Sequence, residues 1–275
     1  APPGRTSALF HDVIQEGERA LQHLRDTVMV EGPHTIAAIM LESVVGTNGV
    51  LVPPDGYLEG VRDLCDEHGI VMIADEVMSG FGRCGEWFAI DHWGVVPDLI
   101  AFAKGVNSGY VPLGGVIISP EIAATFDERP YPGGLTYSGH PLACASAVAS
   151  IRIFKEEGII DNVRTLADEI IGPRLKEIAD KHPSVGEVRG LGFMWALDLV
   201  RDKGTREPLV PFNASGEAAT PMLEFAAACK ASGLWPFTHY NRTHVAPPLT
   251  TTADELNEGL DLLDAALDVA DRHTT

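Results

Sequence analysis

The chain has 275 residues, of which 45% are hydrophobic and 21% are charged, and its formal net charge is −19. This composition predicts a folded protein of one large or two ordinary domains and excludes a disordered one. The negative charge argues against a nucleic-acid partner, and no apolar run approaches the roughly 20 residues of a membrane span. We therefore predict neither nucleic-acid nor membrane binding.

The cysteines and the N-terminal residues indicate the cellular compartment of the protein. The chain has four cysteines, which are Cys65, Cys84, Cys144 and Cys229. They are widely spaced with no C-x-x-C pair, and the N-terminal residues contain no apolar signal-peptide core. We therefore expect reduced thiols, no metal site and a cytoplasmic location.

The first half of the chain alternates helix-like and strand-like segments. A helix is predicted over residues 11–27, and another over 57–68, whose apolar residues recur at helical spacing before Gly69. The strands predicted in this half are 35–41, 71–74, 99–102 and 114–119. Nearly continuous apolar strands that alternate with helices are typical of a parallel sheet covered on both faces. The sequence therefore predicts an α/β fold.

The pattern of the sequence changes after Gly158. The elements predicted around and beyond it are helices over 140–157, 163–181, 217–231 and 253–270, antiparallel strands within 185–200, and a strand over 234–237. We place a domain boundary near residue 160, so that residues 1–160 belong to a large domain and residues 161–275 form a small α+β domain.

Two predicted strands of the large domain end in residues of opposite charge. Asp75 follows the apolar run 70–74, and Lys104 follows the run 99–103. Open α/β sheets bind ligands at the carboxyl ends of their strands. A lysine there either extends its amine to the sheet edge or is a nucleophile that can form a Schiff base with an aldehyde such as pyridoxal phosphate. In that case the carboxylate would keep the pyridine nitrogen protonated.

The glycine-rich segment between these strands matches a nucleotide-binding pattern. Gly80-Phe-Gly82-Arg-Cys-Gly85 satisfies G-x-G-x-x-G. The turn is not tight, the following EWFAIDHWG is a poor start for the helix that a pyrophosphate needs, and no acid follows the second strand. We therefore reject a dehydrogenase and interpret the segment as a loop that turns beside a ligand or a partner subunit.

Three longer motifs carry a resemblance to a known family, and they are DEVMSGFGRCGEWFA, VVPDLIAFAKGVNSGYVPLGGV and TYSGHPLACASA. They resemble the class III aminotransferases of ω-amino acids and amines, which are fold type I enzymes that use pyridoxal 5'-phosphate. The resemblance implies that Lys104 is the Schiff-base lysine and general acid–base, and that Asp75 faces the pyridinium. It also implies that Val77 packs on the ring and that Thr136 binds the cofactor phosphate of the neighbouring subunit in a homodimer or higher homo-oligomer.

The resemblance also implies an activity, in which an amino group moves from an ω-amino acid or amine, such as β-alanine or taurine, to a keto acid such as pyruvate in a ping-pong cycle. An aminomutase or a decarboxylase on the same fold, and a non-catalytic remnant, stay open as alternatives. The chain resembles the family from about residue 35 to its C-terminus. The N-terminal portion that supplies a phosphate loop and a ring-stacking aromatic is missing, so we expect a mostly parallel large-domain sheet that is incomplete at its N-terminus.

The residues that would recognise the substrate depart from the family pattern. Thr47 stands where many relatives carry a glutamate, and His244 stands where the matching arginine is usual. Arg242 is the candidate for binding a substrate carboxylate or sulfonate, because a guanidinium binds such groups bidentately, and a surface arginine in a loop is the alternative. Trp87 is a candidate for lining the substrate pocket, with a core or interface position as the alternative.

Overall fold

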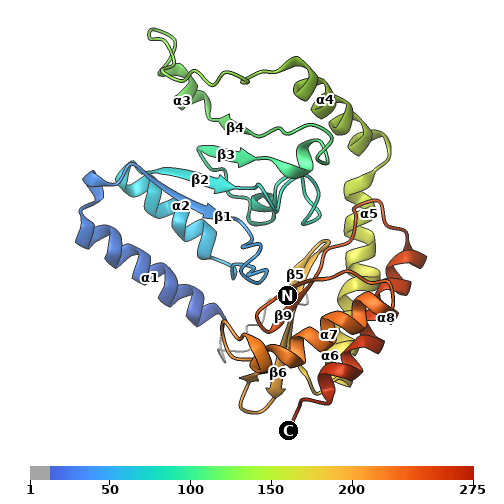
Figure 1. The fold of residues 1–275 in the computed structure, drawn as a ribbon. Helices are drawn as coiled ribbons and strands as arrows, with labels where there is room; N and C mark the ends of the chain where they lie inside the picture. The colour runs from blue at the N-terminus through green and yellow to red at the C-terminus, as the bar shows by residue number, and fades with distance from the viewer. Residues whose placement is uncertain (1–12) are drawn as a thin grey trace. The chain divides into compact units, whose positions relative to one another are not determined.

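The computed structural model describes residues 13–275, which divide into two compact units (Figure 1). The first unit is formed by residues 14–46 and 53–160, and the second by residues 161–275 together with the segment 47–52. The first two residues of the helix predicted over 11–27 lie outside the described residues. Among the described helices, none combines the length and apolar character that a membrane span requires.

The first unit is built on a four-stranded sheet with the strand order β1–β2–β3–β4. Its strands are β1 (Ala38–Glu42), β2 (Val71–Asp75), β3 (Leu99–Phe102) and β4 (Gly115–Ile118). β1, β2 and β3 are parallel, with Glu42 opposite Asp75 and Asp75 opposite Ala101. The predicted mostly parallel α/β sheet is thus confirmed.

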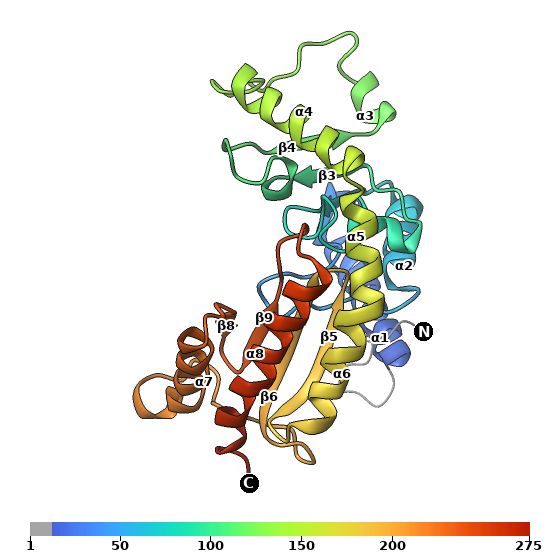
Figure 2. The same cartoon turned by 90° about the vertical axis from the view of Figure 1, so that its right-hand side faces the viewer.

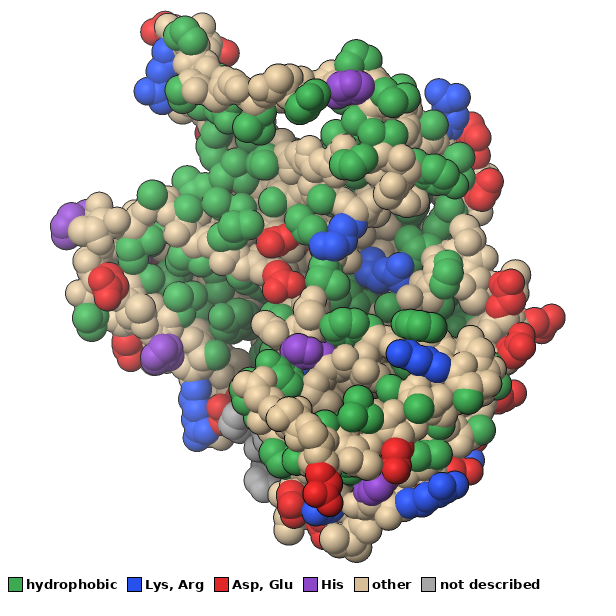
Figure 3. Space-filling view, in the orientation of Figure 1, with side chains coloured by type: hydrophobic (Ala, Val, Ile, Leu, Met, Phe, Trp, Pro, Cys, Tyr) green, Lys and Arg blue, Asp and Glu red, His purple; other side chains and the backbone are tan. Residues whose placement is uncertain are grey.

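The fourth strand is the antiparallel member of this mostly parallel sheet. β4 runs antiparallel to β3, with Phe102 opposite Gly115. Only the short turn η3 (Lys104–Val106) forms between the two strands, whereas a parallel return requires a crossover, usually a helix. The expected cover on both faces is also absent at this edge, because Val116 is 56% exposed and hydrophobic side chains show on the surface over the sheet (Figure 3).

The helices of the first unit come from segments that the sequence largely identifies, and α2 packs against β2 of the sheet. They are α1 (Val13–Glu31), α2 (Tyr57–His68), α3 (Pro120–Ala124) and α4 (Pro141–Glu156), with 3-10 turns η1 (Pro33–Thr35) and η2 (Ala89–Trp93). In α2 the buried Leu58, Val61 and Leu64 recur at helical spacing. The helix ends at Gly69 in the left-handed conformation, as predicted, since glycine adopts it without steric cost.

The second unit combines an antiparallel sheet with four α-helices. Its strands are β5 (Val185–Leu191), β6 (Met194–Asp202), β7 (Glu207–Pro208), β8 (Phe237–His239) and β9 (Arg242–Val245), in the order β5–β6–β9–β8 with β7 beside β6. Its helical segments are α5 (Ile159–Leu166), the π-helical η4 (Ala167–Ile171), α6 (Gly172–Lys181), η5 (Gly216–Ala219), α7 (Thr220–Ala231) and α8 (Ala253–Asp271). The antiparallel strands and the closing amphipathic helix predicted for this region are confirmed.

Strand alternation gives the sheet of the second unit one apolar and one polar face. Leu197 and Leu199 belong to the core of this unit, together with residues of α6 and α8, and these two helices lie side by side over the sheet (Figure 2). The residues that alternate with Leu197 and Leu199 along β6 point to the opposite face of the sheet. The opposite face therefore carries Asp198, and its cross-strand partners Glu187 and Arg242 share that face.

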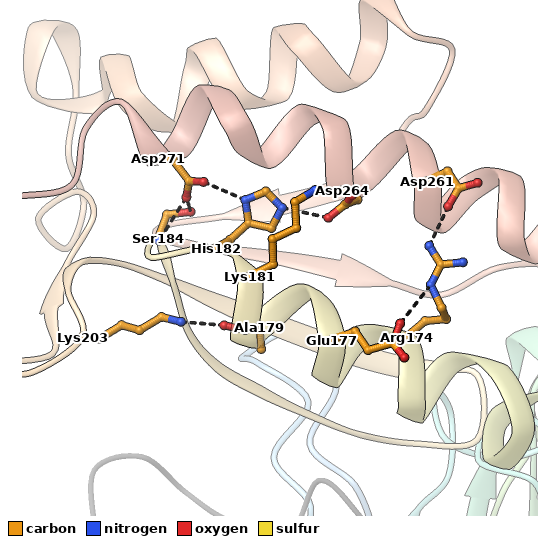
Figure 4. Close-up of polar contacts among 10 residues, drawn as sticks. All are labelled: Arg174, Glu177, Ala179, Lys181, His182, Ser184, Lys203, Asp261, Asp264 and Asp271. Carbon is orange, nitrogen blue, oxygen red and sulfur yellow. Dashed lines mark hydrogen bonds and ion pairs between the residues drawn. The ribbon is translucent and has the colours of Figure 1, made fainter.

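A polar network ties α8 to the turn between α6 and β5 (Figure 4). His182 is 1% exposed, and its ring nitrogens lie 2.8 Å from Asp264 and 2.7 Å from Asp271. Ser184 Oγ donates to Asp271 at 2.6 Å, and Lys181 Nζ donates to Asp264 at 2.6 Å. Because the ring of His182 bridges Asp264 and Asp271, this network fixes the last turns of α8.

Candidate functional site

The strands β2 and β3 are adjacent and parallel (Figure 1), and Asp75 is the last residue of β2, while Lys104 follows the end of β3 by two residues. Asp75 lies opposite Ala101. The N–H of Glu76 donates to the carbonyl of Ala101 at 2.9 Å, which continues the pairing past the end of the strand. The structure therefore places both residues at the sheet edge where parallel sheets bind ligands.

The backbone leaves the strand conformation at Lys104. Its φ is +42°, a value in the left-handed region that residues with a side chain rarely adopt. In a regular strand, alternation would place Lys104 on the face opposite to that of Ala101 and its partner Asp75. The turn at Lys104 ends this alternation, and the strained conformation coincides with the predicted nucleophile.

The amine of Lys104 is exposed, and the loop that follows Lys104 is held by hydrogen bonds. Lys104 is exposed and has no hydrogen-bond or ion-pair partner among the described residues. It borders a hollow of about 490 Å³, whose other lining residues are Asn107, Gly109, Val111, Pro112, Leu113 and Gly114. Asn107 is 2% exposed, and its Nδ2 donates to the Val111 carbonyl at 2.6 Å and to Ser146 Oγ of α4 at 3.0 Å.

Asp75 presents one carboxylate oxygen that the protein leaves unused. Its Oδ1 accepts the N–H of Val77 at 3.0 Å, which orients the carboxylate and keeps Val77 beside it. Its Oδ2 accepts no hydrogen bond from any residue that the structure describes. A half-buried carboxylate with one committed and one available oxygen can accept a hydrogen bond from a cationic ligand.

Glu76 is a structural residue of the site that the sequence interpretation missed. It is 0% exposed, and its carboxylate accepts Ser79 Oγ at 2.7 Å and the N–H groups of Ala89 and Ile90 at 2.9 and 2.8 Å. These bonds hold the start of η2 against the end of β2. The available signal was the second acid in the Asp75-Glu76 pair, because a carboxylate directly after a core strand needs buried donors.

The glycine-rich loop leads into the 3-10 turn η2 and not into an α-helix. A Cβ on Gly80 would lie 2.7 Å from the Glu76 carbonyl, and one on Gly105 would lie 2.9 Å from Phe81 Cβ. The glycines thus let the loop pack closely against the segment after Lys104. The geometry agrees with rejecting a dinucleotide site, and burial raises the pKa of the Cys84 thiol, which makes it an inert filler of the loop.

Trp87 packs among other aromatic rings, whereas Thr136 is exposed. The Trp87 ring lies 6.4 Å from Phe81 and 5.7 Å from Phe154 between centroids, with Lys155 Nζ 5.9 Å above it, which favours the core alternative. Thr136 lies in an exposed loop before α4 and has no hydrogen-bond partner among the described residues. Among the described residues, no interaction joins Thr136 to Lys104.

In the second unit, Arg242 is the first residue of β9 and is engaged by the protein. Its Nη1 donates to the Asn48 carbonyl, and its Nε lies 3.5 Å from Asp198 Oδ1. Arg242 thus lies at the start of a strand and has partners within the protein. Asp198 also binds Arg189, a second arginine that the sequence interpretation missed and that is only 7% exposed.

His244 lies on the same face as Arg242. Burial, together with the charges of Arg242 and Arg189, lowers the pKa of His244 to about 4. The imidazole is therefore neutral near pH 7, and its ring meets that of Phe237 edge-on at 5.1 Å. His244 thus adds no positive charge to those of Arg242 and Arg189 near pH 7.

Comparisons with known proteins identify the family. A family model described as "Aminotransferase class-III" matches residues 4–267. The chain is 38% identical over 253 residues to a putrescine–pyruvate aminotransferase of Pseudomonas aeruginosa, covering 92% of this chain and 54% of that protein. It is 34% identical to gamma aminobutyrate transaminase 2 of Solanum lycopersicum, covering 90% and 54%. The chain therefore spans about half the length of the curated relatives it matches.

Solved structures give the same result. Taurine:2-oxoglutarate aminotransferase from Bifidobacterium kashiwanohense, solved in complex with PLP and glutamate, superposes with a TM-score of 0.91 at 42% identity, over 96% of this chain and 58% of that one. An amine transaminase of an uncultivated Pseudomonas species in its PLP-bound form has a TM-score of 0.87 at 37% identity, over 96% and 59%. The predicted fold class, that of the fold type I pyridoxal-phosphate transferases, is confirmed. The chain belongs to the class III aminotransferases.

Proposed function

We propose that this chain carries the cofactor lysine of an aminotransferase, which uses pyridoxal 5'-phosphate to move an amino group from an ω-amino acid or amine to a keto acid. Family membership supports the reaction class. The observation that carries the proposal is the unpaired amine of Lys104, held at the end of β3 beside the strand that ends in Asp75. Arg242 favours donors that carry an acidic group, and a taurine aminotransferase is among the similar structures.

The side chains at this sheet edge fit the reactive end of the cofactor. Pyridoxal phosphate presents an aldehyde, which needs a primary amine, and a pyridine nitrogen, which needs an anionic hydrogen-bond acceptor when protonated. Lys104 Nζ and Asp75 Oδ2 are such groups, and neither has a partner among the described residues. Lys104 would therefore hold the cofactor covalently, Asp75 would face its ring nitrogen, and Val77 would pack against its ring.

The chain's own residues then perform the proton chemistry. Bound pyridoxal phosphate supplies an electron sink that stabilises negative charge on the donor carbon. Asp75, whose Oδ1 is fixed by the N–H of Val77, would accept a hydrogen bond from the protonated ring nitrogen and keep the proton there. Lys104 Nζ, as a neutral amine, removes the proton from the amine-bearing carbon of the donor and, as an ammonium, returns it. Lys104, whose backbone turns with a φ of +42°, is one of the residues that line the hollow, which supports this role.

The assembly and the location are further parts of the proposal. A homodimer or higher homo-oligomer would bring Thr136 to the cofactor phosphate of the neighbouring subunit, which agrees with its exposed loop before α4. The first unit would be part of the large cofactor domain, and the second unit would be the small domain. A cytoplasmic location agrees with the four cysteines, none of which forms a disulfide in the described part of the chain.

The decisive experiment is the absorbance of the full-length protein reconstituted with pyridoxal phosphate. We expect a band near roughly 410 nm that Lys104→Ala abolishes, and no such loss for Lys155→Ala on the exposed side of α4. Stoichiometric consumption of a keto acid with the donor would separate an aminotransferase from an aminomutase or a decarboxylase. Absence of the band from the wild-type protein would refute the proposed function.

A further inference from the structure

Two arginines share one aspartate on the polar face of the second-unit sheet. Asp198 lies directly opposite Arg242 on β9 and opposite Glu187 on β5, so strand alternation places all three on this face. Arg189 follows two residues after Glu187 and reaches Asp198 diagonally, with its Nη1 2.6 Å from Asp198 Oδ2. The contact from Arg242 Nε to Asp198 Oδ1 is longer, at 3.5 Å.

The same two arginines hold one tight turn of the segment 47–52. Arg242 Nη1 donates to the carbonyl of Asn48, and Arg189 Nε donates to the carbonyl of Gly49 at 2.7 Å. Gly49 has a φ of +127°, and a Cβ there would meet Arg242 Nη1 and lie 2.9 Å from Arg189 Nη2. Only a glycine lets this backbone pass between the two guanidinium groups.

Of the three side-chain nitrogens of Arg242, these contacts involve Nε and Nη1. Nε faces Asp198, Nη1 is bound to the carbonyl of Asn48, and Nη2 has no partner among the described residues. Arg189 takes Oδ2 of Asp198 in the shorter contact, which leaves Oδ1 as the oxygen that faces Arg242 Nε. The guanidinium is thus engaged through Nε and Nη1, and the Tyr240 ring lies 5.9 Å from its Cζ.

We propose that Asp198 is a positioning residue for Arg242, and that Arg189, which anchors both Asp198 and Gly49, keeps Asp198 from competing with an acidic substrate. This proposal rests on the proposed function, in which Arg242 binds the carboxylate or sulfonate of an amino donor. An arginine that is already ordered loses less side-chain entropy when it binds a ligand. The affinity for acidic donors should therefore be higher, while the affinity for neutral amines is unchanged.

The test compares an acidic donor with a neutral donor of matched size in the full-length holoenzyme. β-Alanine and propylamine are each supplied without a keto acid, so that only the donor binds, and the half-saturation concentration and limiting rate are measured. Asp198→Asn should raise the half-saturation concentration for β-alanine about tenfold, with the limiting rate and the propylamine values within about twofold of the wild type. Asp261→Asn, which removes the exposed partner of Arg174 in the same unit, is the matched control.

Two further measurements make the assignment specific to Arg242. In an Asp198→Asn, Arg242→Gln double variant, the aspartate substitution should add nothing to the effect of Arg242→Gln, because Asp198 acts through that guanidinium. Propionate, which lacks an amine and does not react, should bind about tenfold more weakly to the Asp198→Asn holoenzyme by calorimetry. If Asp198→Asn does not fold by circular dichroism, Arg189→Gln serves in its place, because it releases Asp198 to pair with Arg242 and should weaken propionate binding to the same extent.

The outcomes separate this proposal from the proposed function. An enzyme without the Lys104-dependent band refutes the function itself. An active enzyme in which Arg242→Gln leaves the β-alanine half-saturation unchanged overturns the substrate role of Arg242, and with it this proposal. If Arg242→Gln raises that value but neither Asp198→Asn nor Arg189→Gln changes it, Arg242 binds the substrate and the positioning role is overturned.

Discussion

The carboxylate of Glu76 accepts the backbone N–H of Ile90 at 2.8 Å, although 14 residues separate them along the chain. The same carboxylate accepts Ser79 Oγ and the N–H of Ala89, and none of it is exposed. The glycine-rich loop between these residues is therefore closed by one buried acidic side chain that accepts three hydrogen bonds. Since Asp75 precedes Glu76 directly, the bonds that close the loop also fix the strand end that carries the predicted cofactor ligand.

Glu76→Gln should lower the free energy of unfolding by about 2–3 kcal/mol, because the amide group turns an NH₂ toward donors that need an acceptor. Urea unfolding of the full-length protein measures this loss, and weaker retention of pyridoxal phosphate during dialysis measures its effect on Asp75. Glu67→Gln is the control, since Glu67 is exposed and should change stability by less than about 0.5 kcal/mol. Equal stability of the two variants would contradict the role given to Glu76.

Asp75→Asn should reduce the limiting rate of the amino-group transfer by about a hundredfold or more, because an amide holds no negative charge opposite the ring nitrogen. The band near roughly 410 nm should persist, since Lys104 is unchanged. Steady-state kinetics beside the absorbance spectrum separates the two effects. Asp63→Asn on the exposed side of α2 is the control, and a variant Asp75→Asn of full activity would remove Asp75 from the site.

The ends of β2 and β3 are predictable because an apolar run in a parallel strand stops where the chain reaches the sheet edge, and Asp75 and Lys104 mark those stops. The end of α2 is predictable because Gly69 is the residue that takes its left-handed cap. The direction of β4 is not, because its sequence, Gly-Val-Ile-Ile, is a continuous apolar run like those of the parallel strands beside it. Direction depends on whether a crossover helix forms in the connection.

The residues that hold the candidate site in place cannot be predicted from the sequence, for a different reason. Arg189 binds the carbonyl of Gly49 across 140 positions of the chain, and Arg242 binds that of Asn48 across 194. A local pattern carries no information on partners so distant. Glu76 is closer to its donors, but they are backbone N–H groups, which any sequence supplies. Arg242 could be proposed from its motif, whereas Asp198 and Arg189 require the sheet register.

The network around His182 predicts a pH-dependent contribution to stability. Burial raises the pKa of Asp264, but the hydrogen bonds and charges of Lys181 and His182 outweigh it and hold that pKa below its usual range. The stabilisation is present above the unfolded pKa of about 3.9 and is lost as the pH falls through the folded value. Asp264→Asn should therefore cost about 1 kcal/mol at pH 7 and less in acid.

Urea unfolding at pH 7 and at pH values below 4 tests this dependence. Asp180→Asn, an exposed residue of α6, is the control and should give the same small difference at every pH. A deficit of the Asp264→Asn variant that stays constant from pH 7 into acid would show that the carboxylate does not titrate as the network requires.

His244 predicts a second acid sensitivity, with its own range of pH. Burial, then the charges of Arg242 and Arg189, lower the pKa of His244 to about 4, whereas an unfolded histidine titrates near 6.5. Between these values the unfolded chain binds a proton that the folded chain excludes, so stability falls as the pH drops from about 6.5 to 4. Allowing for the solvent that reaches this half-buried ring, the loss is about 1 kcal/mol.

His244→Gln removes the titrating group, so its unfolding free energy should fall by about 1 kcal/mol less than that of the wild type over this range. Urea unfolding at pH 7, 5.5 and 4 measures the difference, and His34→Gln at an exposed position should follow the wild type. Parallel curves for the wild type and His244→Gln would mean that the imidazole takes up its proton in the folded protein. In that case Arg242 and Arg189 would have a third cation beside them at pH 5, and acidic donors should bind more tightly there than at pH 7.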